Sequence, residues 1–104
     1  MTTEVAEKIT HPERGELELS AVLHALSDPV RLKMVAALDS DTEHTCAGFD
    51  VPVTKSTCTH HFKVLREAGV IRQRQQGTSR LNTLRREDLD ARFPGLLDSV
   101  LRSA

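Results

Sequence analysis

The sequence predicts a single, mainly α-helical domain that carries one small β-hairpin. Three observations predict this fold class. Apolar residues recur at three- and four-residue steps on both sides of Asp28-Pro29, and again from Cys58 to Leu65. Such steps are typical of helices with one buried face. The turn-forming stretch 76–79 lies between two extended runs, which favours a hairpin.

Length and composition agree with a small binding module. A chain of 104 residues is long enough for one core, and three Phe without Trp or Tyr offer no stacking platforms for single-stranded bases. No apolar run approaches the roughly 20 residues that span a bilayer. Two Cys without an export signal indicate reduced thiols, so we expect a cytoplasmic protein.

Charge is distributed unevenly along a chain whose formal net charge is −1. Residues 54–86 hold 8 of the 14 Lys and Arg residues but one of the 15 acidic residues, Glu67. The basic residues are Lys55, Lys63, Arg66, Arg72, Arg74, Arg80, Arg85 and Arg86. A basic helix followed by a basic hairpin attracts polyanions, so the segment predicts a nucleic-acid partner. The alternative is a solvated charged face.

The start of the chain is predicted to be an arm outside the core. Residues 1–15 are polar and show no sustained apolar period, so we expect a flexible N-terminal arm there. Residues 16–104 then form the single folded domain. Its first helix begins after Glu16 and has an apolar stripe. The stripe consists of Leu19, Val22, Leu23 and Leu26.

A second helix follows Ser27. Asp28 suits the N-cap and Pro29 the first helical position. The buried stripe consists of Val30, Met34, Val35 and Leu38, which places Arg31 and Lys33 outside. Residues 39–52 are polar and turn-rich, with at best one short helix around 46–50.

The next helix, over residues 55–68, has the clearest pattern. Thr54 can cap its start, and Gly69 can end it. Its buried stripe consists of Cys58, Phe62 and Leu65, widened by Val64 and Ala68. This geometry turns the polar face toward solvent or a ligand, namely Lys55, Ser56, Thr59, His60, Lys63 and Arg66. We expect His61 to be packed and hydrogen-bonded, and Cys58 to fill a core position.

A hairpin and a closing helix complete the predicted domain. Extended residues from Val70 and from Arg80 flank the turn, which places Arg74 and Arg80 near the hairpin tip. Pro94 interrupts the last helical region, so we expect a short turn at 87–91 and a helix over about 94–102. The predicted domain thus has several helices, one of which presents its polar face to a ligand, followed by a basic hairpin. This arrangement predicts a winged helix-turn-helix.

Three segments carry a resemblance to a known family. They are Ala25-Leu26-Ser27-Asp28-Pro29-Val30-Arg31, then His60-His61-Phe62 with Leu65-Arg66-Glu67-Ala68-Gly69, and then the hairpin. In this order and spacing the chain resembles the ArsR/SmtB-type (arsenic-repressor) transcriptional regulators over residues 16–101. The resemblance implies a homodimer on a palindromic, double-stranded DNA operator. It also implies that the first and last helices form the dimer interface, with Leu19, Val22, Leu23, Leu96, Leu97, Val100 and Leu101 as the candidates.

The chemistry of the exposed side chains then suggests their roles on DNA. Ser56, Thr57 and Thr59 are short donors and acceptors suited to base edges or phosphates, and His60 can do either. Lys55 and Lys63 suit phosphates, as do Arg74 and Arg80 at the hairpin.

The resemblance implies two places for a sensed metal. A site in the last helix is disfavoured, because no His or Cys follows His61 and Asp side chains alone suit Zn, Ni or Co poorly. The other site begins at Cys46, which lacks the second Cys of the family's usual pair. His44 and Asp50 lie nearby, and His11 of the partner subunit could complete a Zn or Ni site. This incomplete ligand set favours the alternative to a metal site, in which Cys46 is a small buried residue and the histidines lie on the surface.

Two further function classes remain as alternatives. The sequence contains no glycine-rich phosphate loop or metalloprotease signature, and adjacent histidines diverge by about 100° on a helix, so we expect no enzyme. A dimer controlled by a regulatory protein partner would account for the poor metal-ligand set. The other alternative is a redox switch between Cys46 and Cys58, although no sequence feature indicates a lowered thiol pKa.

Overall fold

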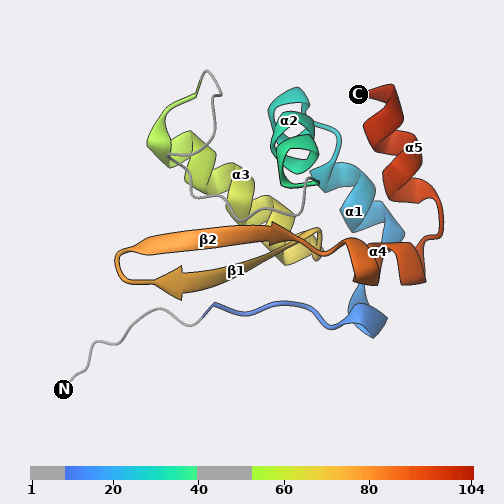
Figure 1. The fold of residues 1–104 in the computed structure, drawn as a ribbon, viewed down its shortest axis with the longest axis horizontal. Helices are drawn as coiled ribbons and strands as arrows, with labels where there is room; N and C mark the ends of the chain where they lie inside the picture. Colours follow the sequence, from blue (N-terminus) through green and yellow to red (C-terminus); the bar gives the residue numbers. More distant parts are fainter. Residues whose placement is uncertain (1–8, 40–52) are drawn as a thin grey trace.

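The computed structural model describes residues 9–39 and 53–104 of the chain. These residues form five α-helices, one 3-10 helix and a two-stranded antiparallel sheet (Figure 1). The order is η1 (Arg14–Glu16), α1 (Leu19–Ala25), α2 (Pro29–Leu38), α3 (Lys55–Ala68), β1 (Ile71–Gln76), β2 (Ser79–Leu84), α4 (Arg86–Arg92) and α5 (Leu96–Ser103). The predicted winged helix-turn-helix is therefore confirmed. The short helix expected around 46–50 lies outside the described residues.

The turn between α1 and α2 is fixed by the Asp28 side chain. Its Oδ1 accepts hydrogen bonds from the backbone N–H groups of Val30 (2.8 Å) and Arg31 (3.1 Å). Pro29 occupies the first helical position, where its missing N–H leaves no bond unmade. The bond from Arg31 lowers the pKa of the Asp28 carboxyl, against an opposing effect of burial. The predicted start of this helix is confirmed.

Helix α3 begins and ends where its sequence predicts. Thr54 Oγ1 accepts from the backbone N–H of Thr57 at 3.2 Å and caps the first turn. Gly69 ends the helix in the left-handed conformation with φ 86°. Its N–H donates to the carbonyl of Arg66, and the next N–H donates to that of Leu65. This tight exit sends the chain directly from α3 into β1.

The hairpin pairs its two strands in a simple register. Ile71 lies opposite Leu84 at the base, and Gln76 lies opposite Ser79 at the tip. Gly77 adopts φ 61° in the two-residue turn between the strands, a conformation that favours glycine. Arg74 and Arg80 lie close to this turn, as predicted.

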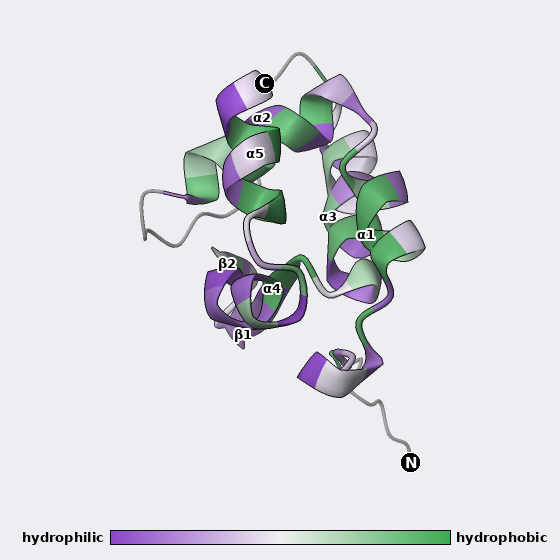
Figure 2. Ribbon diagram, turned by 90° about the vertical axis from the view of Figure 1, so that its right-hand side faces the viewer, coloured by the Kyte–Doolittle hydropathy of each residue, from purple (hydrophilic) through white to green (hydrophobic). Residues whose placement is uncertain are grey.

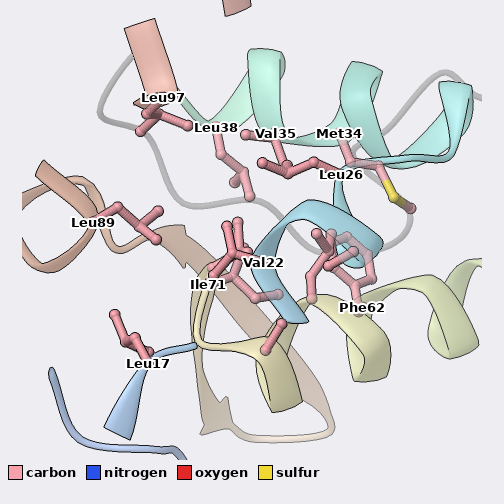
Figure 3. Packing of buried hydrophobic residues seen from close by; sticks show 14 of the residues in the cluster. Leu17, Val22, Leu26, Met34, Val35, Leu38, Phe62, Ile71, Leu89 and Leu97 are labelled. Carbon is pink, nitrogen blue, oxygen red and sulfur yellow. The ribbon is translucent and has the colours of Figure 1, made fainter. Parts of the chain in front are cut away.

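One hydrophobic core joins α1, α2, α3, the base of the hairpin, α4 and α5 (Figure 3). Its members are Leu17, Val22, Ala25, Leu26, Met34, Val35, Leu38, Cys58, Phe62, Leu65, Ala68, Val70, Ile71, Leu89 and Leu97. Figure 2 shows that hydrophobic residues concentrate on α1, α2 and α3, whereas the hairpin and α4 are mostly hydrophilic. The hairpin therefore depends on its base, and on polar contacts, for its position.

Arg86 links the closing helices to the end of α2. Its guanidinium donates to Asp39 after α2 and to Asp98 in α5, each at 2.9 Å, and it lies 3.4 Å from Asp90 in α4. The hydrogen bonds to Asp39 and Asp98 raise the pKa of Arg86, so it stays charged. The closing helix predicted over 94–102 corresponds to α5, and the expected turn at 87–91 forms the longer helix α4.

The N-terminal segment follows β1 instead of standing apart from the domain (Figure 1). His11 Nε2 accepts from the backbone N–H of Gln73 at 2.9 Å, the Pro12 carbonyl accepts from Arg85 at 2.7 Å, and Arg14 donates to Asp88 at 2.7 Å. Residues 9–15, expected as part of the flexible arm, are thus bound to the hairpin and α4. An edge strand presents unpaired N–H groups, and the segment supplies an acceptor for one of them.

Gly69 should tolerate no side chain. A Cβ built there would lie 2.0 Å from Leu17 Cδ2, in a backbone conformation that L residues rarely adopt. We expect Gly69→Ala to lower the free energy of unfolding by about 2–4 kcal/mol, from left-handed strain and overpacking together. Thermal or urea denaturation measures the loss.

Gly77→Ala is the matched control for that experiment. Gly77 also has a positive φ, but a Cβ there would meet nothing within 4 Å. Its substitution should cost about 1–2 kcal/mol, from strain alone. Equal losses at the two positions would mean that the contact with Leu17 contributes nothing.

The docked segment should respond to pH through His11. Burial lowers the pKa of His11, and the nearby charges of Arg72, Arg85 and Arg66 lower it further. The folded chain then binds fewer protons than the unfolded chain below about pH 6.5, so stability falls as pH drops through that value. Denaturation between pH 7.5 and 5.5 should show a smaller loss for His11→Gln than for the wild type. If stability fell equally with pH in the two proteins, His11 would not be the group responsible for the loss.

Candidate nucleic-acid interface

The exposed face of α3 carries the polar residues that the sequence predicts. Lys55, Ser56, Thr57, Thr59, His60 and Lys63 are all exposed. The Thr54 hydroxyl lies within hydrogen-bond distance of the hydroxyls of Ser56 (3.3 Å) and Thr57 (3.0 Å). Thr59 donates its hydroxyl to the Lys55 carbonyl at 2.9 Å. The first two turns therefore present hydroxyl groups held against the helix, with a lysine at each side.

The opposite face of α3 is buried and includes two polar residues. His61 is packed and hydrogen-bonded, as predicted, and Cys58 and Phe62 lie in the core. Arg66, predicted to face solvent, is 9% exposed and donates to Gln73 Oε1 at 3.0 Å. The prediction for Arg66 is wrong because the hairpin folds back over the last turns of α3. Helical spacing alone does not indicate that cover.

Arg31, predicted to lie outside, is the second correction. Its side chain is 8% exposed, and Nε donates to the Ala25 carbonyl at 2.6 Å. Nη2 donates to the His24 carbonyl at 3.3 Å, and Nη1 lies 3.1 Å from Nδ1 of His61. These two carbonyls at the end of α1 have no partner within the helix, and the guanidinium donates to both. The His24 carbonyl also accepts from the N–H and the hydroxyl of Ser27. Because arginine only donates, His61 Nδ1 must accept, which fixes its tautomer.

The hairpin brings two arginines to its outer end. Arg74 is exposed and donates to Gln76 Oε1 at 3.2 Å, and Arg80 is half-buried on the opposite strand. Gln75 closes the turn by donating to the Gly77 carbonyl at 2.8 Å. The tip therefore combines a defined turn with two cationic side chains.

Of the remaining four basic residues of segment 54–86, three are held by the fold, whereas the Arg72 side chain is 55% exposed. Arg66 and Arg85 are buried, and Arg86 is bound to the carboxylates around it. Arg72 and Arg85 both pair with Asp88, at 3.5 and 2.9 Å. Burial alone would raise the pKa of Asp88, but hydrogen bonds from Arg14 and Arg85 outweigh it and hold the pKa below its ordinary value. The cationic surface therefore lacks Arg66, Arg85 and Arg86, which the sequence suggests as members.

Of the candidate metal ligands, the described part of the chain contains His11 alone. His11 uses Nε2 to accept from Gln73, so this atom is occupied while the segment is docked. His44, Cys46 and Asp50 lie outside residues 9–39 and 53–104. Within those ranges, no three His, Cys, Asp or Glu side chains gather in a way that could hold a metal ion.

The candidate dimer residues fall into three groups. Leu19 and Leu23 on α1 are 47% and 45% exposed and lie one helical turn apart. Leu96, Val100 and Leu101 on α5 are partly buried against the core. Val22 and Leu97 are buried in the chain's own core, at 0% and 2% exposure.

Sequence reasoning missed two buried polar residues in the hairpin. Gln73 and Asn82 are 6% and 1% exposed and lie opposite each other in the register. Gln73 has the same strand parity as the core residue Ile71, and that parity was the available signal. The hairpin turns a polar pair, and not an apolar one, toward α3.

Comparison with known proteins gives consistent similarities. Residues 26–74 match a family of helix-turn-helix domains. The uncharacterized HTH-type transcriptional regulator YceK of Bacillus subtilis (strain 168) is 33% identical over 82 residues, which cover 76% of this chain and 82% of YceK. Within residues 9–39 and 53–104, no helix has the length and apolarity needed to cross a membrane.

Solved structures share the fold. A protein described as a possible transcriptional regulator for arsenical resistance is 31% identical, with a TM-score of 0.61 and coverage of 79% of this chain and 84% of that one. An ArsR family transcriptional regulator has 24% identity and a TM-score of 0.62, covering 78% and 90%. The transcriptional repressor BigR from Xylella fastidiosa has 24% identity and a TM-score of 0.58, covering 72% and 85%. The two at 24% identity indicate the fold alone.

Proposed function

The chain belongs to the ArsR-type helix-turn-helix transcriptional regulators, and we propose that it acts as a homodimer on a palindromic DNA operator. One observation carries the proposal beyond the family. Of the eight basic residues in segment 54–86, four lie at the surface of α3 and toward the tip of the hairpin, on the two elements that reach DNA in this fold. They are Lys55, Lys63, Arg74 and Arg80.

These four cations would position the protein on the phosphate backbone. Lys55 and Lys63 flank the exposed hydroxyls of α3, and Arg74 and Arg80 extend the cationic surface to the hairpin. Phosphate contacts of this kind give affinity and orientation but no sequence choice. Sequence choice would come from Ser56, Thr57, Thr59 and His60, which have the short donors and acceptors that base edges require.

A homodimer would place two such surfaces on one operator. Leu19 and Leu23 supply exposed apolar area on α1, and the outer sides of Leu96, Val100 and Leu101 supply more on α5. Large apolar side chains exposed together are typical of an interaction surface. Two symmetry-related copies of α3 would then lie about 34–36 Å apart, one turn of DNA.

Control of the dimer by a metal ion is the second candidate. It is supported by the 31% identity to the structure described for arsenical resistance. The sequence offers one thiolate, two imidazoles and one carboxylate for Zn or Ni, from His11, His44, Cys46 and Asp50. With His11 engaged on β1, a site that used its Nε2 would first have to release the N-terminal segment.

The contribution of the hairpin, which is the wing of this fold, to DNA binding is tested by the salt dependence of that binding. Arg74→Ala with Arg80→Ala should weaken binding to a palindromic upstream fragment. It should also lower the slope of log affinity against log salt by about 0.9 for each phosphate that the protein no longer neutralises. Fluorescence anisotropy at several salt concentrations measures both.

Arg102→Ala is the matched control, because Arg102 is an exposed arginine at the end of α5. It should leave the slope unchanged, and a slope that also stays unchanged in the double variant would remove the hairpin from the interface. The same titration with added Zn, Ni or Co tests the second candidate. A change with one metal that Cys46→Ser abolishes supports it, and indifference to all three excludes it.

The dimer is tested at Leu23. Leu23→Asp puts a charge on the exposed apolar side of α1 without entering the core, so it should split the dimer while leaving the monomer folded. Sedimentation gives the mass and circular dichroism the folding. Ala36→Asp, at an exposed position of α2, is the control and should remain dimeric. A Leu23→Asp variant that sediments as a dimer would contradict this interface.

A further inference from the structure

A chain of side-chain hydrogen bonds, the first two of them buried, leads from α3 across both strands of the hairpin. Arg66 donates through Nη1 to Gln73 Oε1 at 3.0 Å. Gln73 donates through Nε2 to Asn82 Oδ1 at 2.7 Å. Asn82 in turn lies 3.4 Å from the Arg80 carbonyl through Nδ2, a longer and weaker contact.

The direction of this chain is set by its first member. A guanidinium has donors and no acceptor, so the oxygen of Gln73 must face Arg66. The Gln73 nitrogen must then face Asn82, whose oxygen accepts, and the Asn82 nitrogen is left to face the Arg80 carbonyl. Each amide therefore has one orientation that satisfies both neighbours. A Gln–Asn pair in any other orientation would place two donors or two acceptors together.

The chain is poorly explained as packing. An apolar pair at positions 73 and 82 would bury similar area, and it would not require Arg66 to be buried. The guanidinium is incompletely satisfied, because Arg66 Nε has no hydrogen-bond partner in the described part of the chain. Buried polar groups of this kind are expensive unless they specify one arrangement over others. What this chain specifies is the register and the tilt of the hairpin against α3.

We propose that Arg66, Gln73 and Asn82 are positioning residues for DNA binding, which hold the wing arginine Arg80 at a fixed place relative to the base-reading face of α3. The inference rests on the proposed function. The chain starts on the helix whose other face carries Thr59 and His60, and it ends on the backbone of Arg80 itself. The backbone N–H of Gln73 is held by His11, so the same residue is fixed from both sides. None of the three side chains needs to touch DNA.

The test is a double-variant cycle that joins Gln73 to Arg80. In the wild-type background, Arg80→Ala should lower the salt slope of a dimer by about 2, from two phosphate contacts at about 0.9 each. Gln73→Leu removes both bonds of the Gln73 side chain while keeping a similar volume. In that background Arg80→Ala should lower the slope by less than half as much, because the arginine is no longer held in place. If Arg80→Ala lowered the salt slope by the same amount in both backgrounds, the proposal would be overturned.

Gln73→Glu keeps the test decisive if Gln73→Leu does not fold. Its carboxylate still accepts from Arg66, so the link between α3 and β1 remains. It offers no donor to Asn82, and if the Asn82 amide turns over, its oxygen faces the Arg80 carbonyl. The chain is broken in either arrangement, so Arg80→Ala should again have less than half of its wild-type effect. Thr83→Val, nearly isosteric and next to Asn82 on the other face of β2, should leave that effect unchanged.

Amide hydrogen exchange without DNA separates this inference from the proposed function. Gln73→Leu and Gln73→Glu should speed exchange in β2 relative to α5, and Thr83→Val should not. Equal exchange in all variants would overturn the positioning role even where DNA binding changes. A wild-type protein that binds no DNA would overturn the proposed function, and a selective rise in β2 exchange would then still show that the chain holds the hairpin.

Discussion

The Arg31 guanidinium joins three helices at one point, and the presentation of α3 depends on it. It belongs to α2, donates to the carbonyls of His24 and Ala25 at the end of α1, and donates to His61 on the inner side of α3. His61 directly follows His60, so a bond on the buried side of the helix fixes the rotation of its exposed side. Removing one partner of such a buried bond typically leaves the other unsatisfied, at about 1–3 kcal/mol. The orientation of the exposed face of α3 is therefore set by a contact within the core.

The basic residues of the chain divide into two groups with different tasks. Arg66, Arg85 and Arg86 each donate to acceptors on other elements, and they tie α3, the N-terminal segment and the closing helices together. Lys55, Lys63, Arg74 and Arg80 remain on the surface that faces outward. Asp88 pairs with Arg14, Arg72 and Arg85 and offsets part of the positive charge at the base of the hairpin. A positive field weighted toward one side of a protein favours a defined orientation on a polyanion.

Sequence reasoning identified the elements and missed the contacts between them. The cap residues Asp28, Thr54 and Gly69 act locally, so their roles follow from a few neighbouring residues. Arg31 and Arg66 were misplaced because each meets partners from another element, and helical spacing gives a direction without saying what covers it. The burial of Gln73 and Asn82 was not predicted for a similar reason, because a polar residue in a short strand is expected to be exposed. For His11, the partner is 62 positions away in the chain.

The docking of residues 9–17 on distant partners also has a consequence for biosynthesis. His11 binds Gln73, the Pro12 carbonyl binds Arg85, and the Leu17 carbonyl accepts from Arg92. The segment is synthesised before all three of these partners, and its last anchor requires Arg92. Contacts this far apart in sequence form late, because the chain between them must be ordered first. Residues 9–17 are thus synthesised before their partners but dock late in folding, and until then β1 keeps an open edge that another chain could pair with.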